Sequence, residues 1–372
     1  MKAKKKGKLS LFDKIFLWIN CGLCLALLLA YMAPVTDPRK YWVIAFFGLA
    51  YPPILLANLL MIVYWALRRS WLVLISVITI VCGFGVLKNN IGLHPGNRDP
   101  LKSTNPAAVR MMTYNVHSFK KYGAVNDVST RHDILAIISA KQPDVIGIEE
   151  YFTRKRGRFA MTDSIKKIIG SDNYDVQNFS GSDTEVEGIA IFSKWPIVAK
   201  GFIQLSSMFS GNQCVYADIK KGNQIFRLYS VHLQSINFDP EDYRYIDTVT
   251  QRGKPDIGST RRLGGKLKRA FLKRAEQVEL VKAHANKCPY PYIIAGDFND
   301  TPTSYAVNQM EKGIKNAFHE KGFGLGRTYN GDFPNYQIDY IMASKQFDVA
   351  SYTVIEKKLS DHFPVYADLM LR

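Results

Sequence analysis

Residues 292–302 read YIIAGDFNDTP, a short apolar run that ends in a cluster of polar residues. The apolar part is rich in β-branched side chains, which predicts a buried strand at residues 292–295. Asp297 and Asn299 follow it closely. An aspartate or asparagine after a strand is most often a turn former that bonds its own backbone. The stretch therefore points to a functional site only if other strands end in the same way.

The same pattern recurs along the C-terminal two thirds of the chain. Polar residues stand at the ends of further predicted strands, namely Asn115 in TYNVH, Glu150 in IGIEE, His232 in SVHL, Asp339 in IDYI, and Asp361 with His362 in SDHFPV. Loops at strand ends can bring such side chains together. Carboxylates, amides and two histidines in one place are typical of a hard divalent cation with an acid–base apparatus. Because no Cys/His cluster accompanies these oxygen donors, we expect Mg²⁺ or Mn²⁺ rather than zinc.

Around these residues the sequence predicts many strands with few helices between them. Strands are expected at residues 110–115, 145–148, 189–192, 214–219, 225–233, 292–295, 337–342, 348–355 and 364–369. Helices are expected at 130–140, opened by a capping box of Thr130 and Asp133, and at 266–286. This α/β pattern favours a sandwich of mixed sheets over a doubly wound parallel sheet.

In their order, the motifs TYN, PDVIGIEE, EGIAIFSKWPI, SVHL, GDFNDTP, QIDYIM and SDHFPV closely resemble the endonuclease/exonuclease/phosphatase superfamily, the fold of pancreatic deoxyribonuclease. The resemblance covers residues 110–369. It implies a two-sheet sandwich flanked by helices, in four layers α-β-β-α, and a metal-dependent hydrolase of phosphate esters. His232 in SVHL is similar to the deoxyribonuclease, sphingomyelinase and inositol-phosphatase branches. The abasic-site repair branch usually carries a Pro-Asn pair there, so DNA repair is disfavoured.

The resemblance also implies a metal site. Glu150 is expected as the main metal ligand, with Asn115 and Asp361 completing or supporting the site. Glu149, its neighbour, stands where the family commonly has glutamine. Which of the two glutamates binds the metal is therefore left open.

The catalytic residues that the resemblance implies are His232, Asp297, Asn299, Asp339, His362 and Glu187. Asp297 would orient or deprotonate the attacking water, and Asn299 would hold the scissile phosphate. Each histidine would be oriented by a carboxylate, His362 by Asp339 and His232 by Glu187. Such an arrangement stabilises the charge that develops on the phosphoryl oxygens. A solvated charge at a strand end is the alternative interpretation of Glu187.

The net charge of +17 is unevenly distributed, since residues 1–102 carry +10. In residues 252–274, nine basic residues stand against one acidic residue, and the rest of the C-terminal part is near neutral. Within that segment a basic stripe recurs at helical spacing, formed by Arg262, Lys266, Arg269 and Lys273. A solvated helix face is the alternative to contact with substrate phosphates or anionic lipid. The charge therefore indicates one localised anion-binding face.

Three uncharged apolar stretches precede the motifs, at residues 15–33, 41–67 and 71–87. About 20 such residues cross a bilayer as a helix. The sequence therefore predicts a membrane anchor of three transmembrane helices at residues 1–87, the second bent at Pro52 and Pro53. A cleaved signal peptide is the rival interpretation of the first stretch, and the two further stretches argue against it. Residues 88–108 are expected to link the anchor to a catalytic domain at 109–372.

Basic residues near the helix ends predict the orientation of the anchor. A lysine-rich start precedes the first stretch, and Arg68 and Arg69 lie between the second and third. The positive-inside rule then places the N-terminus in the cytoplasm and the catalytic domain outside it, at the cell (inner) membrane. Arg39 and Lys40 lie on the other side and weaken this prediction.

The five cysteines do not form a disulfide scaffold or a metal-type pattern. Cys21 and Cys24 lie inside an apolar stretch, where small membrane-helix residues are the expected interpretation. Cys214 is expected as a buried free thiol in a strand, and its pairing with Cys288 is left open.

Three functions follow from these features. A nuclease acting on nucleic acid outside the cytoplasm is favoured by the motifs and the basic stripe. The same chemistry on a phospholipid or a small phosphate ester is favoured by the membrane anchor. A non-catalytic binding module is the third, and the complete motif set argues against it.

Overall fold

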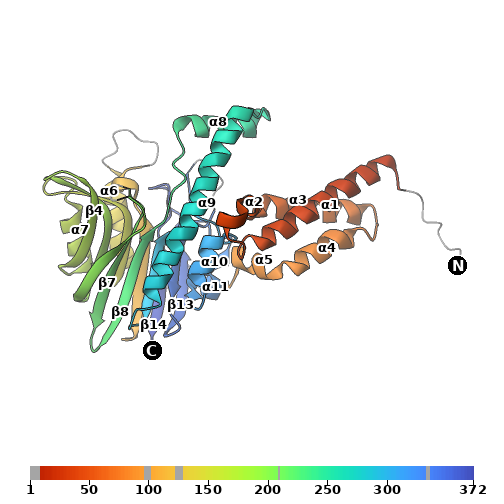
Figure 1. Ribbon diagram of the computed structural model, residues 1–372. Helices are drawn as coiled ribbons and strands as arrows, with labels where there is room; N and C mark the ends of the chain where they lie inside the picture. The colour runs from red at the N-terminus through yellow and green to blue at the C-terminus, as the bar shows by residue number, and fades with distance from the viewer. Residues whose placement is uncertain (1–8, 96–101, 122–128, 208–209, 332–335) are drawn as a thin grey trace. The chain divides into compact units, whose positions relative to one another are not determined.

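Buried side chains along the C-terminal two thirds of the chain build two six-stranded sheets and a two-stranded one (Figure 1). The structure, a computed structural model, describes residues 9–95, 102–121, 129–207, 210–331 and 336–372. The strands are β1 Gly92–Leu93, β2 Ala108–Asn115, β3 Val145–Arg154, β4 Asn173–Gly181, β5 Glu185–Ser193, β6 Ile197–Gln204, β7 Gln213–Lys221, β8 Gln224–His232, β9 Tyr292–Asp297, β10 Lys315–Asn316, β11 Phe323–Gly324, β12 Asp339–Ala343, β13 Phe347–Val354 and β14 Val365–Leu371.

Both large sheets are mixed. One has the strand order β10-β12-β9-β8-β7-β6 and the other the order β13-β14-β2-β3-β5-β4. Strands β8 and β9 are parallel, and so are β2 and β3, whereas their other neighbours are antiparallel. Each sheet therefore contains a pair of parallel strands whose carboxyl ends lie at one edge.

The two sheets pack face to face, and helices cover their outer faces. The helices of this part of the chain are α6 Thr130–Lys141, α7 Met161–Ile169, α8 Pro240–Arg252, α9 Ile257–Ala285, α10 Tyr305–Glu311 and α11 Ala317–Lys321, with a 3-10 turn η1 at His117–Phe119. Met111 and Ile191 of one sheet share a fully buried core with Val215 and Ile293 of the other. Helices α6 and α7 pack on the sheet that contains β3, and α9 and α10 on the sheet that contains β8. The predicted α/β sandwich of two mixed sheets is confirmed.

Several elements differ from the prediction for local physical reasons. Helix α9 begins at Ile257 rather than at residue 266, because Asp256 caps it by accepting a hydrogen bond from the Ser259 N–H at 2.7 Å. The capping box expected at Thr130 is wrong, since Thr130 is already helical and Ser129 makes no side-chain cap bond. Strands β4 and β6 were not predicted because they are sheet edges with mostly exposed residues and no apolar pattern.

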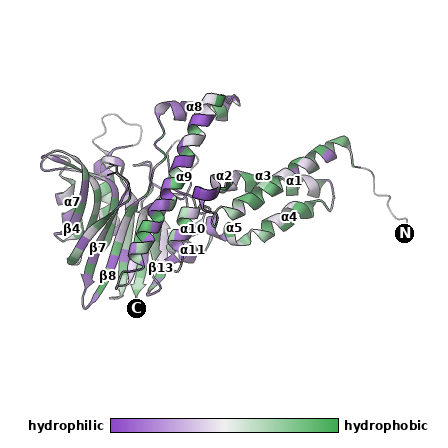
Figure 2. Ribbon diagram, in the orientation of Figure 1, coloured by the Kyte–Doolittle hydropathy of each residue, from purple (hydrophilic) through white to green (hydrophobic). Residues whose placement is uncertain are grey.

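The N-terminal helices form a separate unit of Met1–Lys88 with Thr303–Tyr305, and Asn89–Pro302 with Ala306–Arg372 form the other unit. The helices of the N-terminal unit are α1 Leu11–Met32, α2 Pro38–Leu49, α3 Tyr51–Leu67, α4 Val73–Cys82 and α5 Phe84–Asn90. Figure 2 shows α1, α3 and α4 as largely hydrophobic. Of the predicted linker, α5 takes the first residues, and residues 96–101 lie outside the described part of the chain.

Among the described helices, α1 is the one long and apolar enough to cross a membrane by itself. The other two predicted spans are broken: α2 and α3 meet at 51°, and α4 and α5 at 70°. Pro52 and Pro53 open α3, because proline fits the first turn of a helix and not its interior. Three continuous membrane helices are therefore not what the chain forms, although each bent pair could count as one span.

Buried polar side chains hold α1, α3 and α4 together. Asn20 donates to Ser76 Oγ at 2.6 Å and accepts from Trp65 Nε1 at 2.9 Å. Asn58 Oδ1 accepts from Ser76 Oγ at 3.2 Å and from Cys24 Sγ at 3.3 Å. Hydrogen bonds of this kind stabilise helix association where water is absent. The N-terminal unit is thus a packed bundle and not a set of independent tethers.

The cysteines are free thiols. Cys21 and Cys24 lie within α1, as predicted. Cys214 in β7 is fully buried, which agrees with the expected buried thiol, and Cys288 is unpaired and half-buried.

Candidate active site

Strand pairing brings the candidate catalytic residues together at one edge of the sandwich. Strand β9 ends at Asp297, and its two neighbours set His232 of β8 and Asp339 of β12 opposite that residue. In the other sheet, the parallel pair β2 and β3 sets Asn115 opposite Glu149. Residues that lie far apart in the sequence are therefore neighbours because of the sheet register.

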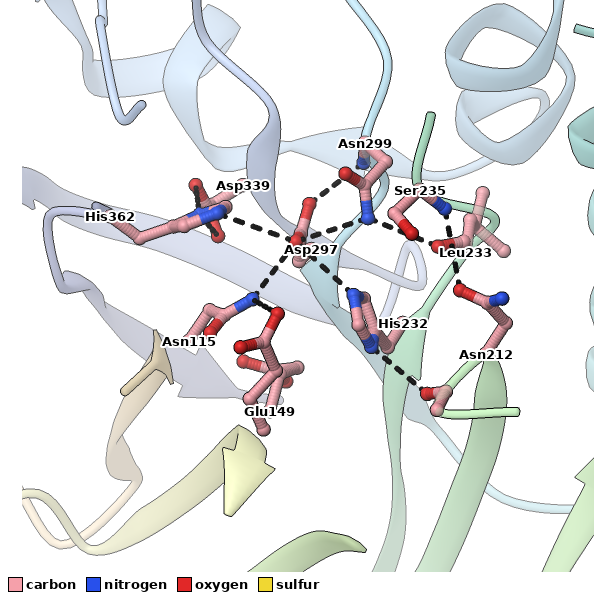
Figure 3. Close-up of polar contacts among 12 residues, drawn as sticks. Asn115, Glu149, Asn212, His232, Leu233, Ser235, Asp297, Asn299, Asp339 and His362 are labelled. Atoms are coloured by element: carbon pink, nitrogen blue, oxygen red, sulfur yellow. Dashed lines mark hydrogen bonds and ion pairs between the residues drawn. The ribbon is translucent and has the colours of Figure 1, made fainter. Parts of the chain in front are cut away.

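The carboxylate of Asp297 is the centre of the cluster (Figure 3). Its side chain is 1% exposed. Oδ1 accepts a hydrogen bond from the Asn299 backbone N–H at 2.7 Å, and Oδ2 accepts from Asn115 Nδ2 at 3.1 Å and Asn299 Nδ2 at 3.2 Å. The Nε2 atoms of His232 and His362 lie 3.5 and 3.6 Å from the same Oδ2. A carboxylate buried this deeply is stable only when donors surround it, as they do here.

The imidazole of His362 is fixed by Asp339, the pair that the motifs imply. Nδ1 of His362 lies 3.0 Å from each carboxylate oxygen of Asp339, and both side chains are buried. Burial by itself lowers the pKa of His362, but the carboxylates of Asp339 and Asp297 outweigh burial and raise that pKa well above its usual value. The raised pKa favours the imidazolium form of His362, in which Nε2, the nitrogen that faces Asp297, also carries a proton.

His232 is oriented by the backbone and not by Glu187. Its Nδ1 donates to the Gly211 carbonyl at 2.9 Å. Glu187 is half-buried on β5 opposite Phe152, and its side chain makes no hydrogen bond or ion pair among the described residues. A Cβ at Gly211 would lie 3.3 Å from the Phe179 ring, so this position is tightly packed. The expected pairing of His232 with Glu187 is wrong.

A bulge in β3 turns Glu150 toward this cluster. The register shifts within the strand, and Glu150 has a left-handed φ of 48°. Its carboxylate accepts from Asn115 Nδ2 at 3.1 Å and lies 3.4 Å from His117 Nδ1. Burial by itself raises the pKa of Glu150, but the contacts with His117, His232 and Asn115 lower that pKa to about 2. Glu150 is thus an ionised carboxylate with 35% of its side chain exposed.

His117 is a functional candidate that the sequence analysis did not single out. It lies between Glu150 and Asp361, with its Nδ1 3.4 Å from one carboxylate and 3.9 Å from the other. The hydrogen bond with Glu150 raises the pKa of His117. His117 stands in the TYNVH motif, which could have indicated it. Its backbone has a left-handed φ of 45°, and sequence spacing does not predict such a conformation. The three expected metal residues, Glu150, Asn115 and Asp361, therefore gather around a histidine.

Glu149 lies in the core between the sheets and not in the site. It is fully buried and accepts from Ser230 Oγ of β8 at 2.8 Å and Thr113 Oγ1 of β2 at 3.2 Å, so it joins the two sheets. Burial raises the pKa of Glu149 to about 8, although the Ser230 hydrogen bond lowers it. The group is protonated and neutral at pH 7, like the glutamine common at this place in the family. Glu150, and not Glu149, is the glutamate available to a metal.

A buried arginine of α9 ties together the loops that follow β8 and β9. Arg274 Nε donates to the Gln234 carbonyl at 2.7 Å, and its Nη1 lies 3.3 Å from Asp300 Oδ2. One turn further on, Gln277 accepts from the Gln234 N–H at 2.8 Å. These loops directly follow His232 and the GDFN motif, so α9 positions both. The sequence feature that could have indicated this role is that Arg274 is a charged residue among the apolar positions of the helix.

Half of the basic stripe is neutralised. Arg262 Nε lies 3.0 Å from Asp242 Oδ1, and Lys266 Nζ lies 2.6 Å from carboxylate oxygens of both Asp239 and Asp242. These acidic residues stand at the N-terminal end of α8, so the pairs fix α8 on α9. These ion pairs give Arg262 and Lys266 a structural role, and their contact with substrate stays a prediction.

The other half of the stripe stays exposed. Arg269 has no hydrogen-bond or ion-pair partner among the residues that the structure describes. Lys273 lies 3.0 Å from Glu276 on the same helix, an exposed pair of the kind that contributes little to stability. Arg269 and Lys273 keep the possibility of contact with an anion.

The donors at this edge fit a hard divalent cation. Three potential ligand atoms lie within 4.8 Å of one another, on Asp297, Asp339 and His362. Asp339 and His362 are already bonded to each other, which leaves the ionised Glu150 as the better ligand. Asn115 and Asp361 add oxygen donors beside it. A set dominated by oxygen suits Mg²⁺ or Mn²⁺.

Comparison with known families agrees with this geometry. A model described as the endonuclease/exonuclease/phosphatase family, whose members generally use a divalent metal, matches residues 112–362. A model of a domain of unknown function (DUF8431) matches residues 13–90. No curated protein matches the chain.

Solved structures show the same fold. An endonuclease/exonuclease/phosphatase from Bacteroides vulgatus is 18% identical, covers 71% of this chain and 99% of its own, and has a TM-score of 0.51. A family protein from Bacteroides thetaiotaomicron is 18% identical, covers 71% and 98%, and has a TM-score of 0.50. A mannosyl-6-phosphatase of the latter organism is 18% identical, covers 70% and 99%, and has a TM-score of 0.48. At these identities the likeness concerns the fold alone.

The two adjacent glutamates should differ in metal binding. Glu150→Gln removes the exposed carboxylate and should weaken Mn²⁺ binding by about tenfold or more, as loss of ligand interactions usually does. Glu149→Gln, the matched control, replaces a neutral buried acid and should leave Mn²⁺ binding unchanged. Isothermal titration of the full-length chain in detergent measures both. Weaker binding in the Glu149 variant alone would contradict the assignment.

The buried Glu149 should also make stability depend on pH. Its folded pKa of about 8 lies above the ordinary value of 4.5, so between these values the folded state keeps a proton that the unfolded state has lost. Its contribution is full below about pH 4.5 and falls as the pH rises toward 8, by about 1.4 kcal/mol for each pH unit. Glu149→Gln should therefore gain Tm over the wild type from about pH 5 to 8 in thermal unfolding. A Tm difference independent of pH would refute this.

Proposed function

We propose that this chain, which belongs to the endonuclease/exonuclease/phosphatase family and is a phosphoester-hydrolysing enzyme, is a membrane-anchored phosphodiesterase that uses a divalent metal ion. The supporting observation is the convergence of Asp297, His232 and His362 (Figure 3) with Glu150 of the other sheet, which bonds Asn115. A non-catalytic binding module would have no use for a buried carboxylate held between two imidazoles.

Asp297 is the group that takes the proton of the attacking water. The backbone N–H of Asn299 and the side-chain amides of Asn115 and Asn299 hold its carboxylate in one orientation. A water bound by this carboxylate is positioned to attack a phosphorus atom while its proton is accepted. Asn299 therefore orients the carboxylate of Asp297, and it also contacts the scissile phosphate.

The two imidazoles lie on opposite sides of Asp297 (Figure 3). His362 holds a proton on Nε2 because Asp339 raises its pKa, so it donates to a phosphoryl oxygen as negative charge develops there. His232, whose Nδ1 is held by a backbone carbonyl, presents Nε2 for proton transfer at the other side. Glu150, Asn115 and Asp361 would hold a divalent cation, which would supply charge neutralisation for the phosphoryl oxygens.

Nucleic acid is the proposed substrate, outside the cytoplasm. The support comes from cations that make no ion pair among the described residues. These are Arg269 and Arg261 of α9, Arg252 at the end of α8, and Lys254 between the two helices. Such side chains bind phosphate backbones without regard to sequence. Pairing of Arg262 and Lys266 reduces this cationic surface but does not remove it.

A phospholipid or a small phosphate ester is the second candidate. The observation in its favour is the hydrophobic N-terminal unit, which would keep the enzyme at a bilayer (Figure 2). The catalytic groups are the same for both candidates, because each reaction attacks a phosphate ester.

Substrate choice is tested with the full-length chain in detergent. We expect Mg²⁺- or Mn²⁺-dependent cleavage of a single-stranded oligonucleotide, loss of cleavage with chelator, and a fall of about 10²–10⁴-fold in kcat for Asp297→Asn, the range typical of a general base. Asp183→Asn, an exposed carboxylate, is the control and should keep the wild-type rate.

Two outcomes of this assay would count against the proposal. An Asp297→Asn variant with the wild-type rate would rule out the mechanism. Turnover of phosphatidylglycerol or a sugar phosphate without cleavage of the oligonucleotide would favour the second candidate.

We further propose that the N-terminal unit crosses the cell (inner) membrane three times, with each bent helix pair as one span. Arg68 at the end of α3 pairs with Asp13 at the start of α1 at 2.6 Å, so Arg68 and Lys14 stand at helix ends that share one side. The positive-inside rule makes that side cytoplasmic and the catalytic unit extracytoplasmic.

Fusion reporters at the C-terminus test this topology. Alkaline phosphatase, which is active only after export, should be active there, and green fluorescent protein, which fluoresces in the cytoplasm, should stay dark. The same reporters fused before residue 9 serve as the inverse control. A fluorescent C-terminal fusion would overturn the orientation.

A further inference from the structure

A cavity of about 370 Å³ opens between α9 and the loop that follows β8. Its walls are residues 234–237 of that loop and, on the helix, residues 266, 269, 270, 272, 273 and 276. The volume falls in the range of roughly 300–1,000 Å³ that is usual for small-ligand sites. The cavity can therefore hold one monomer unit of a larger substrate.

The cavity adjoins the catalytic cluster. Ser235, which lines it, stands three residues after His232, and Figure 3 shows both in the same close-up. The loop is held to the cluster, because Asn299 Nδ2 donates to the Leu233 carbonyl at 3.0 Å. The loop is also held to the helix, through the buried Arg274 bonded to the Gln234 carbonyl. A substrate that places its phosphate at Asp297 can reach the cavity with the adjacent unit.

The basic residues around the cavity differ in whether an acidic side chain neutralises them. Lys266 at one end is neutralised by two aspartates, as described above. Arg269 is exposed and has no partner among the described residues, and Lys273 pairs only with Glu276 on the helix surface. Arg269 is thus the cation of this cavity that is available to a ligand.

The wall beside these cations is apolar. Ile236 and Leu272 line the cavity and are half-buried. Ala270, which also lines it, is buried. An occupant that suits both features carries an anionic group for Arg269 and a flat or apolar group for the wall. A guanidinium binds phosphate with directed, paired hydrogen bonds.

We propose that this cavity is a substrate subsite that holds the nucleotide next to the scissile phosphate. Its phosphate binds Arg269, with Lys273 in support, and its base or sugar lies against Ile236 and Leu272. The inference rests on the proposed nuclease function and adds a place where substrate is recognised beyond the reacting phosphate. Arg274 is a positioning residue for the subsite, because it fixes the loop that forms one wall.

The subsite is tested with the full-length chain in detergent and two substrates. One is a single-stranded oligonucleotide, and the other is bis(p-nitrophenyl) phosphate, a compact diester that does not extend to the cavity. For Arg269→Ala, the rise in KM for the oligonucleotide should exceed that for the compact diester by about tenfold, and the salt dependence of binding should fall by about one ion. Arg269→Lys should recover part of the loss. Leu272→Trp, which fills the cavity, should show the same preference for the compact diester.

Lys345→Ala is the matched control, since it removes one positive charge from the exposed turn between β12 and β13, which does not line the cavity. Equal effects of the two alanine variants, or equal effects of Arg269→Ala on both substrates, would overturn the subsite. A wild-type chain that cleaves the compact diester and phosphatidylglycerol vesicles but no oligonucleotide would instead overturn the nuclease function, and with it the nucleotide as occupant.

Discussion

The buried carboxylate of Asp297 imposes the constraint that the rest of the active site satisfies. A carboxylate removed from water costs several kcal/mol unless donors surround it. Here those donors come from both sheets: Asn115 from the end of β2, and Asn299 and His232 from the ends of β9 and β8. The site therefore exists only when the two sheets are packed face to face. The reacting group and the fold are stabilised by the same contacts.

The bulge in β3 divides two adjacent glutamates between fold and function. Glu149 points between the sheets, where hydroxyl groups of β2 and β8 bond it, and Glu150 points to the site with a left-handed φ. In a regular strand, neighbouring side chains already face opposite sides. The bulge adds a change of direction that lets the second glutamate reach Asn115. Glu149 thus joins the two sheets, while Glu150 is ionised and accessible to a cation.

Helix α9 shows how one basic segment separates into different roles. Spacing correctly placed Arg262, Lys266, Arg269 and Lys273 on one face, because helical periodicity is local. Which of them remain available depends on α8, whose acidic end folds back and neutralises the first two. Arg274, counted with the same segment, is buried and holds the catalytic loops. A charge count along the sequence therefore describes the helix face but not the partners of its charges.

The sequence by itself determined the α/β sandwich, most of the strands that end in polar residues, and the motif residues at those ends, because alternation and turn chemistry are local. It also indicated the apolar N-terminal segment and, through Pro52 and Pro53, the break near Ala50, but not the break near Gly83. Only the tertiary structure decided that His117 lies beside Glu150, that a carbonyl of Gly211 rather than Glu187 orients His232, and which cations stay unpaired. Those contacts join segments distant in the chain, and they depend on bulges, left-handed backbone conformations and sheet register, which residue spacing does not encode.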